Sequence, residues 1–580
     1  MRKTKIICTL GPAVNNEKML RSLVIAGMDV ARFNFSHDTH EGHKSRLAML
    51  RKVAEEERVP VAALMDTKGP EIRLGVFENG RVELKAGETF ALVTNEITGN
   101  SQCASVSYAE LPQELSIGAT ILLDDGLIEL EVLKKTKDKI TCRVVSGGMI
   151  GDKKGVNVPG VELEMPFISD RDRSDILFAA ENGFDFIAAS FTRSAEDIME
   201  MRNLLEQNGH SDIRIIAKIE NHQGIDNIDD ILRVADGIMV ARGDLGVEIP
   251  FDDLPSLQKL LIKKASREGK IVITATQMLE SMIKNPRPTR AEITDIANAI
   301  YDGTSAIMLS GETAYGAYPV EAVQTMVRIA KKTESDIDYK KRFRLRDDPF
   351  VTDVTNAISH AACTTAMDLD VAAIIAITQT GGTAKMVSRF RPDVPIFACT
   401  PVPTVLRQMS MSWGVTPVLV SEVDSLDDLF ELVVQRVMDT GYIKNGDLVV
   451  ITGGVPLGIP GTTNMLKVHV AGDVLLRGKG VNALCACGRT CIALTEEEAR
   501  RKFKAGDVLV MPKTSNEILD LIKHAAGIVT EEKGMNSHAA VAGLALDIPV
   551  ITGALNATRV LKDGVMIQVD AKNDMLHPAD

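Results

Sequence analysis

The chain has 580 residues, of which 45% are hydrophobic and 25% charged, and its formal net charge is −13. This length leaves room for three to four domains of roughly 150 residues each. The negative charge and the lack of a sustained basic stripe argue against a nucleic-acid-binding protein. The apolar runs are shorter than the roughly 20 residues that span a bilayer, so we expect no membrane partner. Scattered cysteines and a start that leads straight into a strand pattern indicate a cytoplasmic protein without a cleavable signal.

Apolar runs that end in polar residues and precede amphipathic helix patterns recur in two groups. They cover residues 3–11, 28–35, 61–65, 184–191, 213–220, 237–242, 271–276 and 305–310. Eight such βα units are the number that closes a (β/α)8 TIM barrel, and a doubly wound open sheet is the alternative that this number disfavours. We therefore predict an α/β protein whose TIM-barrel domain comprises residues 1–69 and 168–340.

The pattern changes between the third and fourth of these units. Residues 70–167 consist of short alternating runs, and the step Asp125-Gly126 is a favourable hairpin turn. This pattern predicts a small inserted β-barrel domain, placed to act as a lid.

Two more domains are expected after the barrel. Residues 341–473 alternate helix and strand patterns, which indicates an open α/β domain. Residues 474–580 begin at a glycine-rich join, Arg477–Gly480, and form a separate small module.

Two charges end an otherwise apolar strand pattern at residues 213–221. Lys218 and Glu220 lie on one face because side chains alternate along a strand. A buried strand accommodates such charges only where it meets a cleft, as strands of a barrel do at their carboxyl ends. We expect Lys218 and Glu220 to hold a phosphorylated substrate and a divalent metal.

Other strand patterns end in residues of matching chemistry. Arg32 is a second cation suited to phosphate, and Asp244 is a second hard oxygen ligand for Mg²⁺. Gly243 and Asp244 follow a strand and open a possible helix whose N–H groups suit a carboxylate, and Thr276 adds a hydroxyl. Purely structural ion pairing is the alternative, but so many charges on separate strands are costly without a ligand.

Four further oxygen donors follow the second and third strand patterns. Asn34, Ser36, Asp66 and Thr67 carry one full charge among them, which suits a large monovalent cation such as K⁺ better than Mg²⁺. The same residue types also cap helices and shape turns, so the residues alone leave both interpretations open.

Long strings of this sequence resemble those of pyruvate kinases. They are ARFNFSH (31–37), MDTKGPEIR (65–73), KKGVNVPG (153–160), IIAKIEN (215–221), MVARGDLGVEIP (239–250), TATQMLESM (274–282) and MLSGETA (308–314). The resemblance covers residues 1 to about 473 and implies a barrel, a β lid and an α/β regulatory domain. It also implies phosphoryl transfer from phosphoenolpyruvate to ADP in glycolysis, which gives pyruvate and ATP.

Carried over by motif, the resemblance assigns roles around the substrate. Arg32 and Lys218 would meet the transferring phosphoryl group, and Gly243, Asp244 and Thr276 would position the substrate carboxylate. Glu220 and Asp244 would hold Mg²⁺ or Mn²⁺. The proton donor to the enolate is not identified, although Thr276 with a water chain is a candidate.

The resemblance also implies a nucleotide site and a K⁺ site. Arg73 and Lys154 would reach ADP or ATP, and Asn34 and His37 would also bind the nucleotide. Asn34, Ser36, Asp66 and Thr67 would bind K⁺. Glu71 matches the residue that the family associates with dependence on K⁺, where K⁺-independent members carry lysine.

A glycine-containing loop in the third domain has the features of a phosphate cradle. Residues 377–383 follow a strand pattern and precede a helix pattern, and an ordinary βα turn is the alternative. The family uses this loop for a phosphorylated allosteric effector, which would contact Thr378, Thr380, Gly381, Gly382 and Thr383. The family is usually a homotetramer.

The C-terminal module resembles the phosphohistidine domain of enzymes that use phosphoenolpyruvate, a swivelling type of domain. His538 matches its phosphorylated histidine, but Lys533 and Asn536 replace a glycine and a threonine of that family. We favour a structural or assembly role over phosphate transfer. The cysteines at 485, 487 and 491 lack a fourth ligand in sequence and are interpreted as incidental thiols.

Two other functions fit parts of the pattern. A metal-dependent lyase or aldolase acting on pyruvate would share the acidic metal pair and an arginine, but Arg73 and Lys154 in the lid argue against it. A phosphometabolite sensor with an inactive barrel is disfavoured by the intact set Lys218, Glu220 and Asp244.

Overall fold

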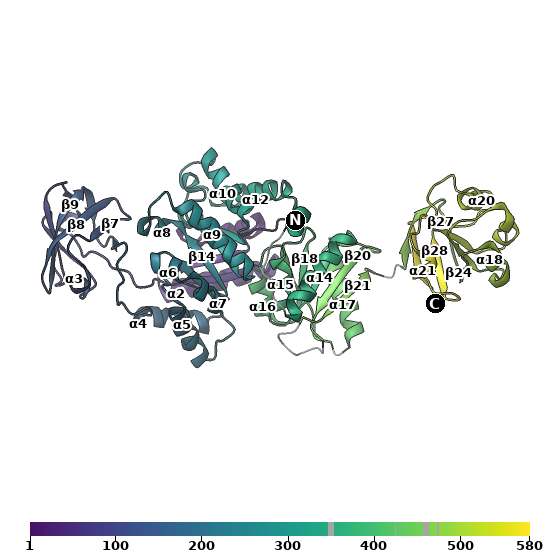
Figure 1. Ribbon diagram of the computed structural model, residues 1–580, viewed down its shortest axis with the longest axis horizontal. Coiled ribbons are helices and arrows are strands. Elements are labelled where there is room, and N and C mark those ends of the chain that lie inside the picture. Colours follow the sequence, from purple (N-terminus) through teal and green to yellow (C-terminus); the bar gives the residue numbers. More distant parts are fainter. Residues whose placement is uncertain (346–352, 424, 456–462, 473–474, 580) are drawn as a thin grey trace. The chain divides into compact units, whose positions relative to one another are not determined.

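The computed structural model describes residues 1–345, 353–423, 425–455, 463–472 and 475–579 (Figure 1). Eight parallel strands close into a barrel in the order β1-β16-β15-β14-β13-β12-β3-β2. Their bounds are β1 Lys5–Thr9, β2 Val30–Asn34, β3 Ala62–Asp66, β12 Phe186–Ala189, β13 Arg214–Ile219, β14 Gly237–Ala241, β15 Ile271–Ala275 and β16 Ala306–Leu309. Each lies within one of the predicted runs or differs from it by a residue at an end, so the predicted TIM barrel is confirmed.

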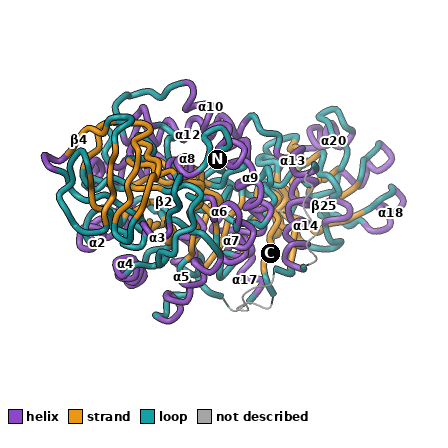
Figure 2. Tube along the Cα trace, turned by 60° about the vertical axis from the view of Figure 1, so that its left-hand side comes forward, coloured by secondary structure: helices purple, strands orange, loops and turns teal. Residues whose placement is uncertain are grey.

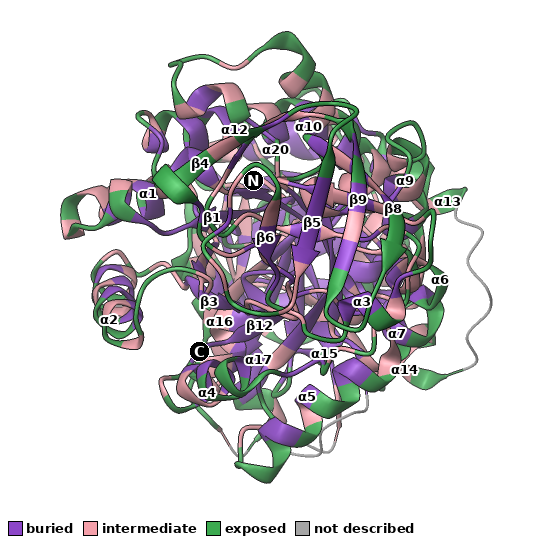
Figure 3. Cartoon of the chain, turned by 90° about the vertical axis from the view of Figure 1, so that its left-hand side faces the viewer, coloured by how far each residue is buried: buried purple, intermediate pink, exposed green. Residues whose placement is uncertain are grey.

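The strands are buried on both faces because two cores enclose them. In β1, Ile7 belongs to the core inside the barrel, whereas Ile6 and Cys8 belong to the core between strands and helices. This explains why the strand runs are continuously apolar rather than alternating. Figure 3 shows buried and exposed residues along helix α2, whose Leu47 and Leu50 are buried.

Helices follow the barrel strands and surround them. They are α1 Glu17–Ala26, α2 His40–Glu56, α4 Asp170–Glu181, α5 Ala195–Gln207, α6 His222–Asp226, α7 Ile228–Val234, α8 Arg242–Glu248, α9 Leu254–Arg267, α10 Arg290–Asp302, α11 Gly311–Ala314, α12 Pro319–Ser335 and α13 Tyr339–Arg344. Helix α1 begins where the side chain of Asn16 accepts a hydrogen bond from the N–H of Met19, and it ends at Gly27, whose φ of 119° is left-handed.

The inserted domain is built from short strands around one core (Figure 2). A six-stranded sheet has the order β11-β7-β8-β9-β5-β6, and β10 pairs with β4 in a second sheet. The bounds are β4 Arg81–Leu84, β5 Thr89–Val93, β6 Cys103–Ser105, β7 Thr120–Leu123, β8 Ile128–Lys135, β9 Lys139–Ser146, β10 Gly148–Gly151 and β11 Val156–Asn157, with one short helix, α3 Leu111–Glu114. The predicted hairpin turn is confirmed, because Leu123 pairs with Ile128 around it.

Contacts divide the chain into two units, residues 1–356 with 378–419 and residues 357–377 with 420–580. In the first unit β18 pairs in parallel with β19, and in the second β17 pairs in parallel with β20, which is antiparallel to β21. The bounds are α14 Val354–Asp368, β17 Ala373–Ile377, α15 Gly382–Arg389, β18 Ile396–Thr400, α16 Pro403–Met409, β19 Val415–Leu419, α17 Leu426–Asp439, β20 Leu448–Gly453 and β21 Met465–Val470. The four-domain boundaries drawn from the sequence stay predictions.

The C-terminal module contains an eight-stranded sheet in the order β22-β29-β28-β24-β25-β26-β27-β23. Its elements are β22 Leu476–Arg477, β23 Lys479–Gly480, β24 Cys485–Ile492, α18 Glu496–Lys502, β25 Val508–Met511, α19 Leu519–Ile522, β26 Gly527–Thr530, α20 His538–Leu546, β27 Val550–Thr552, α21 Ala557–Val560, β28 Met566–Asp570 and β29 Met575–Pro578. Within the described ranges, every helix is too short or too polar to cross a bilayer.

Candidate active site

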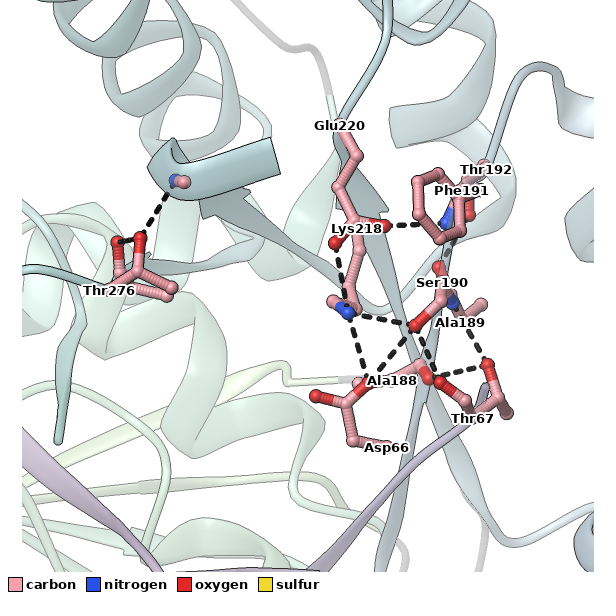
Figure 4. A network of polar contacts seen from close by, with 12 residues as sticks. Asp66, Thr67, Ala188, Ala189, Ser190, Phe191, Thr192, Lys218, Glu220 and Thr276 are labelled. Carbon is pink, nitrogen blue, oxygen red and sulfur yellow. Dashed lines mark hydrogen bonds and ion pairs between the residues drawn. The ribbon is translucent and has the colours of Figure 1, made fainter. Parts of the chain in front are cut away.

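Lys218 lies at the carboxyl end of β13 and is surrounded by oxygen atoms from three other positions. Its Nζ is 3.1 Å from Asp66 Oδ1 and 2.9 Å from Glu220 Oε1, and it donates a hydrogen bond of 2.8 Å to Ser190 Oγ. Figure 4 shows these side chains converging from neighbouring barrel strands. The alternation predicted for Lys218 and Glu220 therefore places both on one side of the strand, and both are buried.

Arg32 joins the same group from β2. Its Nε is 2.6 Å from Asp66 Oδ2, and its Nη1 donates a hydrogen bond of 3.0 Å to Thr9 Oγ1. Asp66 thus receives two cations, one on each carboxylate oxygen. This convergence of β2, β3 and β13 places the two cations predicted to meet a phosphoryl group on a single anion.

The pKa values follow from this crowding. Burial pulls the pKa of Lys218 down, but Asp66, Glu220 and Asp244 outweigh it and hold that pKa above its ordinary value. Burial pushes the pKa of Asp66 up, but Arg32 and Lys218 hold it below its usual range. Lys218 therefore stays protonated and Asp66 stays ionised near neutral pH.

For Glu220, the effect of burial on the pKa outweighs that of the neighbouring cation. Burial, assisted by Asp244, raises its pKa to about 7 against the effect of Lys218. Its Oε1 is buried and lies 2.9 Å from Lys218 Nζ, and its Oε2 accepts a hydrogen bond of 2.6 Å from the N–H of Phe191. A divalent cation beside Glu220 and Asp244 would favour both charged forms, so this donor pair fits a Mg²⁺ completed by substrate oxygens and water.

The predicted helix after Asp244's strand is present as α8, and its start contacts the end of β15. The N–H of Gly243 donates a hydrogen bond of 2.9 Å to Thr276 Oγ1. Thr276 and Gln277 have left-handed φ values of 64° and 56°, a strained conformation for residues other than glycine. Arg242 braces this turn by donating to the carbonyl oxygen of Thr276 at 2.5 Å.

A cavity of about 300 Å³ lies between the inserted domain and the barrel. Arg73 and Lys154 line it from the inserted domain, and Asp244 lines it from the barrel. Arg73 forms an ion pair with Glu71, and Lys154 Nζ is 2.8 Å from Asp124 Oδ1.

The electrostatics of this cavity connect it to the group around Lys218. Burial, Asp244 and Asp124 raise the pKa of Asp125 in the inserted domain. Asp244 also acts on the pKa values of Lys218 and Glu220. Asp244 is therefore close enough to couple both sides of the cleft.

The four residues predicted for K⁺ lie at the ends of β2 and β3. Asn34 pairs with Asp66 across these strands, and its Oδ1 accepts a hydrogen bond of 3.1 Å from the N–H of Ser36. Thr67 Oγ1 accepts one of 3.0 Å from the N–H of Ser190. The hydrogen bond between Asn34 and Ser36 is a turn contact, as in the alternative interpretation. The four predicted residues nevertheless lie together at one end of the barrel. His37 is exposed just beyond them.

The predicted phosphate cradle connects β17 to α15. The N–H of Gly381 donates a hydrogen bond of 2.9 Å to Thr378 Oγ1, and Gly381 has a φ of 85°. The carbonyl oxygen of Thr380 accepts a hydrogen bond of 3.2 Å from Arg214, the first residue of β13. The loop is therefore in contact with the strand that carries Lys218 at its other end. Gly382 is exposed, and Thr383 is buried at the start of α15.

His538 is the first residue of α20, and both of its ring nitrogens have partners. Nδ1 is 2.9 Å from Thr514 Oγ1, and Nε2 is 3.0 Å from Asn516 Oδ1. Among the cysteines of strand β24 in the same module, two are exposed and Cys491 is buried, and all three are free thiols.

Sequence reasoning missed three residues that hold this site together. Ser190 accepts from Lys218 and donates to the carbonyl oxygen of Thr67 at 2.7 Å. Arg242 donates a hydrogen bond to Thr276, and buried Glu312 accepts hydrogen bonds from the N–H groups of Leu279 and Ser310. Ser190 could have been suspected, because it ends an apolar run as Lys218 does.

A TIM barrel that gathers two cations and two metal-type carboxylates beneath a β lid defines an enzyme acting on a phosphorylated, negatively charged substrate. Comparison with known families makes this specific. The pyruvate kinase barrel domain matches residues 1–323, the pyruvate kinase alpha/beta domain matches residues 356–469, and the mobile domain of PEP-utilising enzymes matches residues 503–574. The chain belongs to the pyruvate kinase family, whose members transfer a phosphoryl group from phosphoenolpyruvate to ADP.

Individual relatives extend over nearly the whole chain. A pyruvate kinase of Geobacillus stearothermophilus is 51% identical over 98% of this chain and 97% of its own length, and one of Bacillus licheniformis is 50% identical over 98% of both. A solved pyruvate kinase structure from Cryptosporidium parvum is 42% identical with a TM-score of 0.78, and the match covers 81% of this chain and 96% of that one. The bacterial relatives therefore share the C-terminal module.

Proposed function

We propose that this chain converts phosphoenolpyruvate and ADP to pyruvate and ATP at the carboxyl end of its barrel. One observation carries the proposal: Asp244 lines the same cavity as Arg73 and Lys154 of the inserted domain, and its charge also acts on Lys218 and Glu220 in the barrel. A phosphoryl donor bound beside Lys218 and Glu220 and a nucleotide bound under the lid would therefore meet at one place.

Arg32 and Lys218 are proposed to bind the transferring phosphoryl group. Both are positively charged and form ion pairs with Asp66. A phosphate could replace one of these ion pairs, and each cation would still have an anionic partner. The raised pKa of Lys218 keeps its charge available as negative charge spreads over the phosphoryl oxygens in the transition state.

Glu220 and Asp244 are proposed to hold Mg²⁺ or Mn²⁺, and the substrate carboxylate is proposed to lie against Gly243, Asp244 and Thr276. A bound divalent cation supplies charge neutralisation between substrate oxygens. Only two carboxylates are required, which agrees with the finding that the described residues contain no cluster of three or more His, Cys, Asp or Glu suited to a metal.

The nucleotide is proposed to contact Arg73 and Lys154, which line the cavity beside Asp244. K⁺ is proposed to bind between the ends of β2 and β3, at Asn34, Ser36, Asp66 and Thr67. A monovalent cation there would lie next to Asp66 and so act on the same charge network as Arg32. The loop at residues 378–383 is proposed to bind a phosphorylated effector, supported by its contact with Arg214.

One assay tests the proposed reaction. Pyruvate release from phosphoenolpyruvate is measured with and without ADP, Mg²⁺ and K⁺, and rapid release is expected only when all three are present. Release that does not need ADP would indicate a phosphatase or lyase, and no release under any condition would indicate a binding protein. Replacement of K⁺ by Na⁺ at equal ionic strength should reduce the rate sharply.

A further inference from the structure

A second large cavity lies among the helices that surround the barrel. It shares no lining residue with the cavity at the proposed active site. Its volume is about 640 Å³, within the range of sites for small molecules. Its walls come from α9, α10, α13, residues 389–391 and Trp413, and Figure 2 labels these three helices. No residue to which a role was assigned above lines it.

The charge of this cavity is opposite to that of the whole chain. Six cationic side chains line it, namely Lys259, Lys263, Arg267, Arg342, Arg389 and Arg391. Among the lining residues that the structure describes, Asp302 is the single acidic one, and it pairs with Lys259. The chain as a whole carries a net charge of −13, so this concentration of positive charge is a local feature.

Three of the arginines donate hydrogen bonds to neighbouring oxygen atoms. Arg342 donates a hydrogen bond of 2.9 Å to the carbonyl oxygen of Tyr301, and Arg391 donates one of 3.0 Å to the carbonyl oxygen of Gly303. Arg389 donates to Asn356 Oδ1 at 2.9 Å. Such contacts orient a guanidinium group, and an oriented guanidinium fork suits the oxygens of a phosphate.

Aromatic rings form another part of the wall. Tyr339 and Trp413 have ring centroids 5.4 Å apart, and Phe343 and Phe390 lie 6.3 Å apart. Tyr301 is 39% exposed at the edge of the cavity. Flat apolar surface beside several arginines suits a ligand that combines a phosphate with a sugar or base ring.

We propose that this cavity binds a phosphorylated small metabolite, with its phosphate on the arginines and its ring against Tyr301 and Phe343. The site is separate from the loop at residues 378–383, because none of that loop's residues line it. It is also separate from the proposed active site, so binding can be measured whether or not phosphoryl transfer is observed.

Trp413 provides a direct signal, because it is the single tryptophan of the chain and lines the cavity. Its fluorescence is followed in the full-length protein during titration with glucose 6-phosphate and with adenosine 5′-monophosphate. Glucose and adenosine serve as the matched compounds without phosphate. We expect a saturable change in fluorescence with at least one phosphorylated probe and no change with the matched compound that lacks the phosphate. If neither phosphorylated probe gives a saturable change, the proposal is wrong.

Variants separate this cavity from the effector loop. Lys263→Glu reverses a charge on an exposed lining residue and should weaken the binding seen by Trp413 at least tenfold. Lys264→Glu makes the same change on the next residue of α9, which pairs with Asp229 outside the cavity, and should leave binding within about twofold. Thr383→Val in the effector loop should also leave it unchanged. Loss of the signal in Thr383→Val with retention in Lys263→Glu would assign the binding to the loop and refute the proposal.

Discussion

Replacement of Lys218 by methionine removes a cation from between two carboxylates, Asp66 and Glu220. We expect kcat for phosphoryl transfer to fall by about 10³-fold, because the charge that stabilises the transferring phosphoryl group is lost. Asp66 keeps Arg32, so the barrel should still fold, although Glu220 loses its cation and some stability should be lost. Steady-state kinetics and the circular dichroism spectrum measure the two effects, and near-normal turnover would contradict the role of Lys218.

Ser190 is a positioning residue that acts through Lys218. Ser190→Ala removes the hydroxyl that accepts from Lys218 Nζ and donates to the carbonyl oxygen of Thr67. We expect kcat to fall about tenfold with little change in KM for ADP, since the lysine is kept but less well held, and stability to fall by about 1–3 kcal/mol.

The control for Ser190 is Thr192→Ser, which keeps a hydroxyl bonded to the carbonyl oxygen of Ala189 on the same strand end. It should leave kcat unchanged. Ser190→Thr should restore part of the activity lost in the alanine variant, and equal kcat in wild type and Ser190→Ala would show that Lys218 needs no support there.

His538 should not carry phosphate. Both ring nitrogens contact other side chains, Thr514 and Asn516, so attack on a phosphoryl donor would require breaking one of these hydrogen bonds. We expect no acid-labile phosphate on the protein after incubation with radiolabelled phosphoenolpyruvate. Label that appears in the wild type and is absent from His538→Ala would establish a carrier role instead.

Residue-level prediction succeeded where a charge interrupts an apolar run. Lys218 and Glu220 could be placed together because strand alternation fixes their common face. Ser190 and Arg242 could not be assigned, because a serine or an arginine at a strand end is common and their partners come from other strands. Three-dimensional pairing of this kind depends on the order of strands around the barrel, which one sequence does not contain.

At the scale of elements, the barrel strands were predictable because they are buried on both faces and each ends in polar residues. The left-handed turn at Thr276 and Gln277 was not, because neither residue type favours that conformation. The turn persists because Arg242 holds the carbonyl oxygen of Thr276 and Glu312 holds the N–H of Leu279. Local preference is overridden here by contacts between elements.

Helix α15 follows the proposed effector loop and places Lys385 in an unfavourable setting. Burial, together with Arg214 and Lys270, lowers its pKa to about 8 from an ordinary value of 10.5, and Asp236 opposes this only in part. Below pH 8 this half-buried lysine is charged in both folded and unfolded chains, and the folded state bears the full penalty. Between pH 8 and 10.5 the folded chain releases this proton first, so the contribution of Lys385 to stability becomes less unfavourable as pH rises.

Lys385→Met should therefore stabilise the protein, by up to about 3 kcal/mol, at pH 7. The gain should shrink at pH 10. Thermal unfolding midpoints at the two pH values measure it, with Lys18→Met on the exposed face of α1 as a control that should change little at either pH. A lower midpoint for Lys385→Met at pH 7 would show that its charge is instead required by Asp236.

At the scale of the whole molecule, the proposed catalytic residues all come from residues 1–356, and none comes from the C-terminal module. The sequence predicts this separation, because its resemblance to pyruvate kinases covers residues 1 to about 473. The module has its own sheet and its own apolar clusters. How the module affects assembly is not encoded in any motif.

A chain that ends at Gly472 should therefore keep the reaction. The solved relative from Cryptosporidium parvum is matched over 96% of its length by only 81% of this chain, so a pyruvate kinase fold forms without the remainder. We expect kcat within about twofold of the full-length value, because no proposed substrate contact is removed, and any change should appear in thermal unfolding or in the subunit count measured by light scattering. A truncated protein that remains folded but loses more than tenfold in kcat would show that the module takes part in catalysis, and the assignment of the active site to the barrel and lid alone would then be wrong.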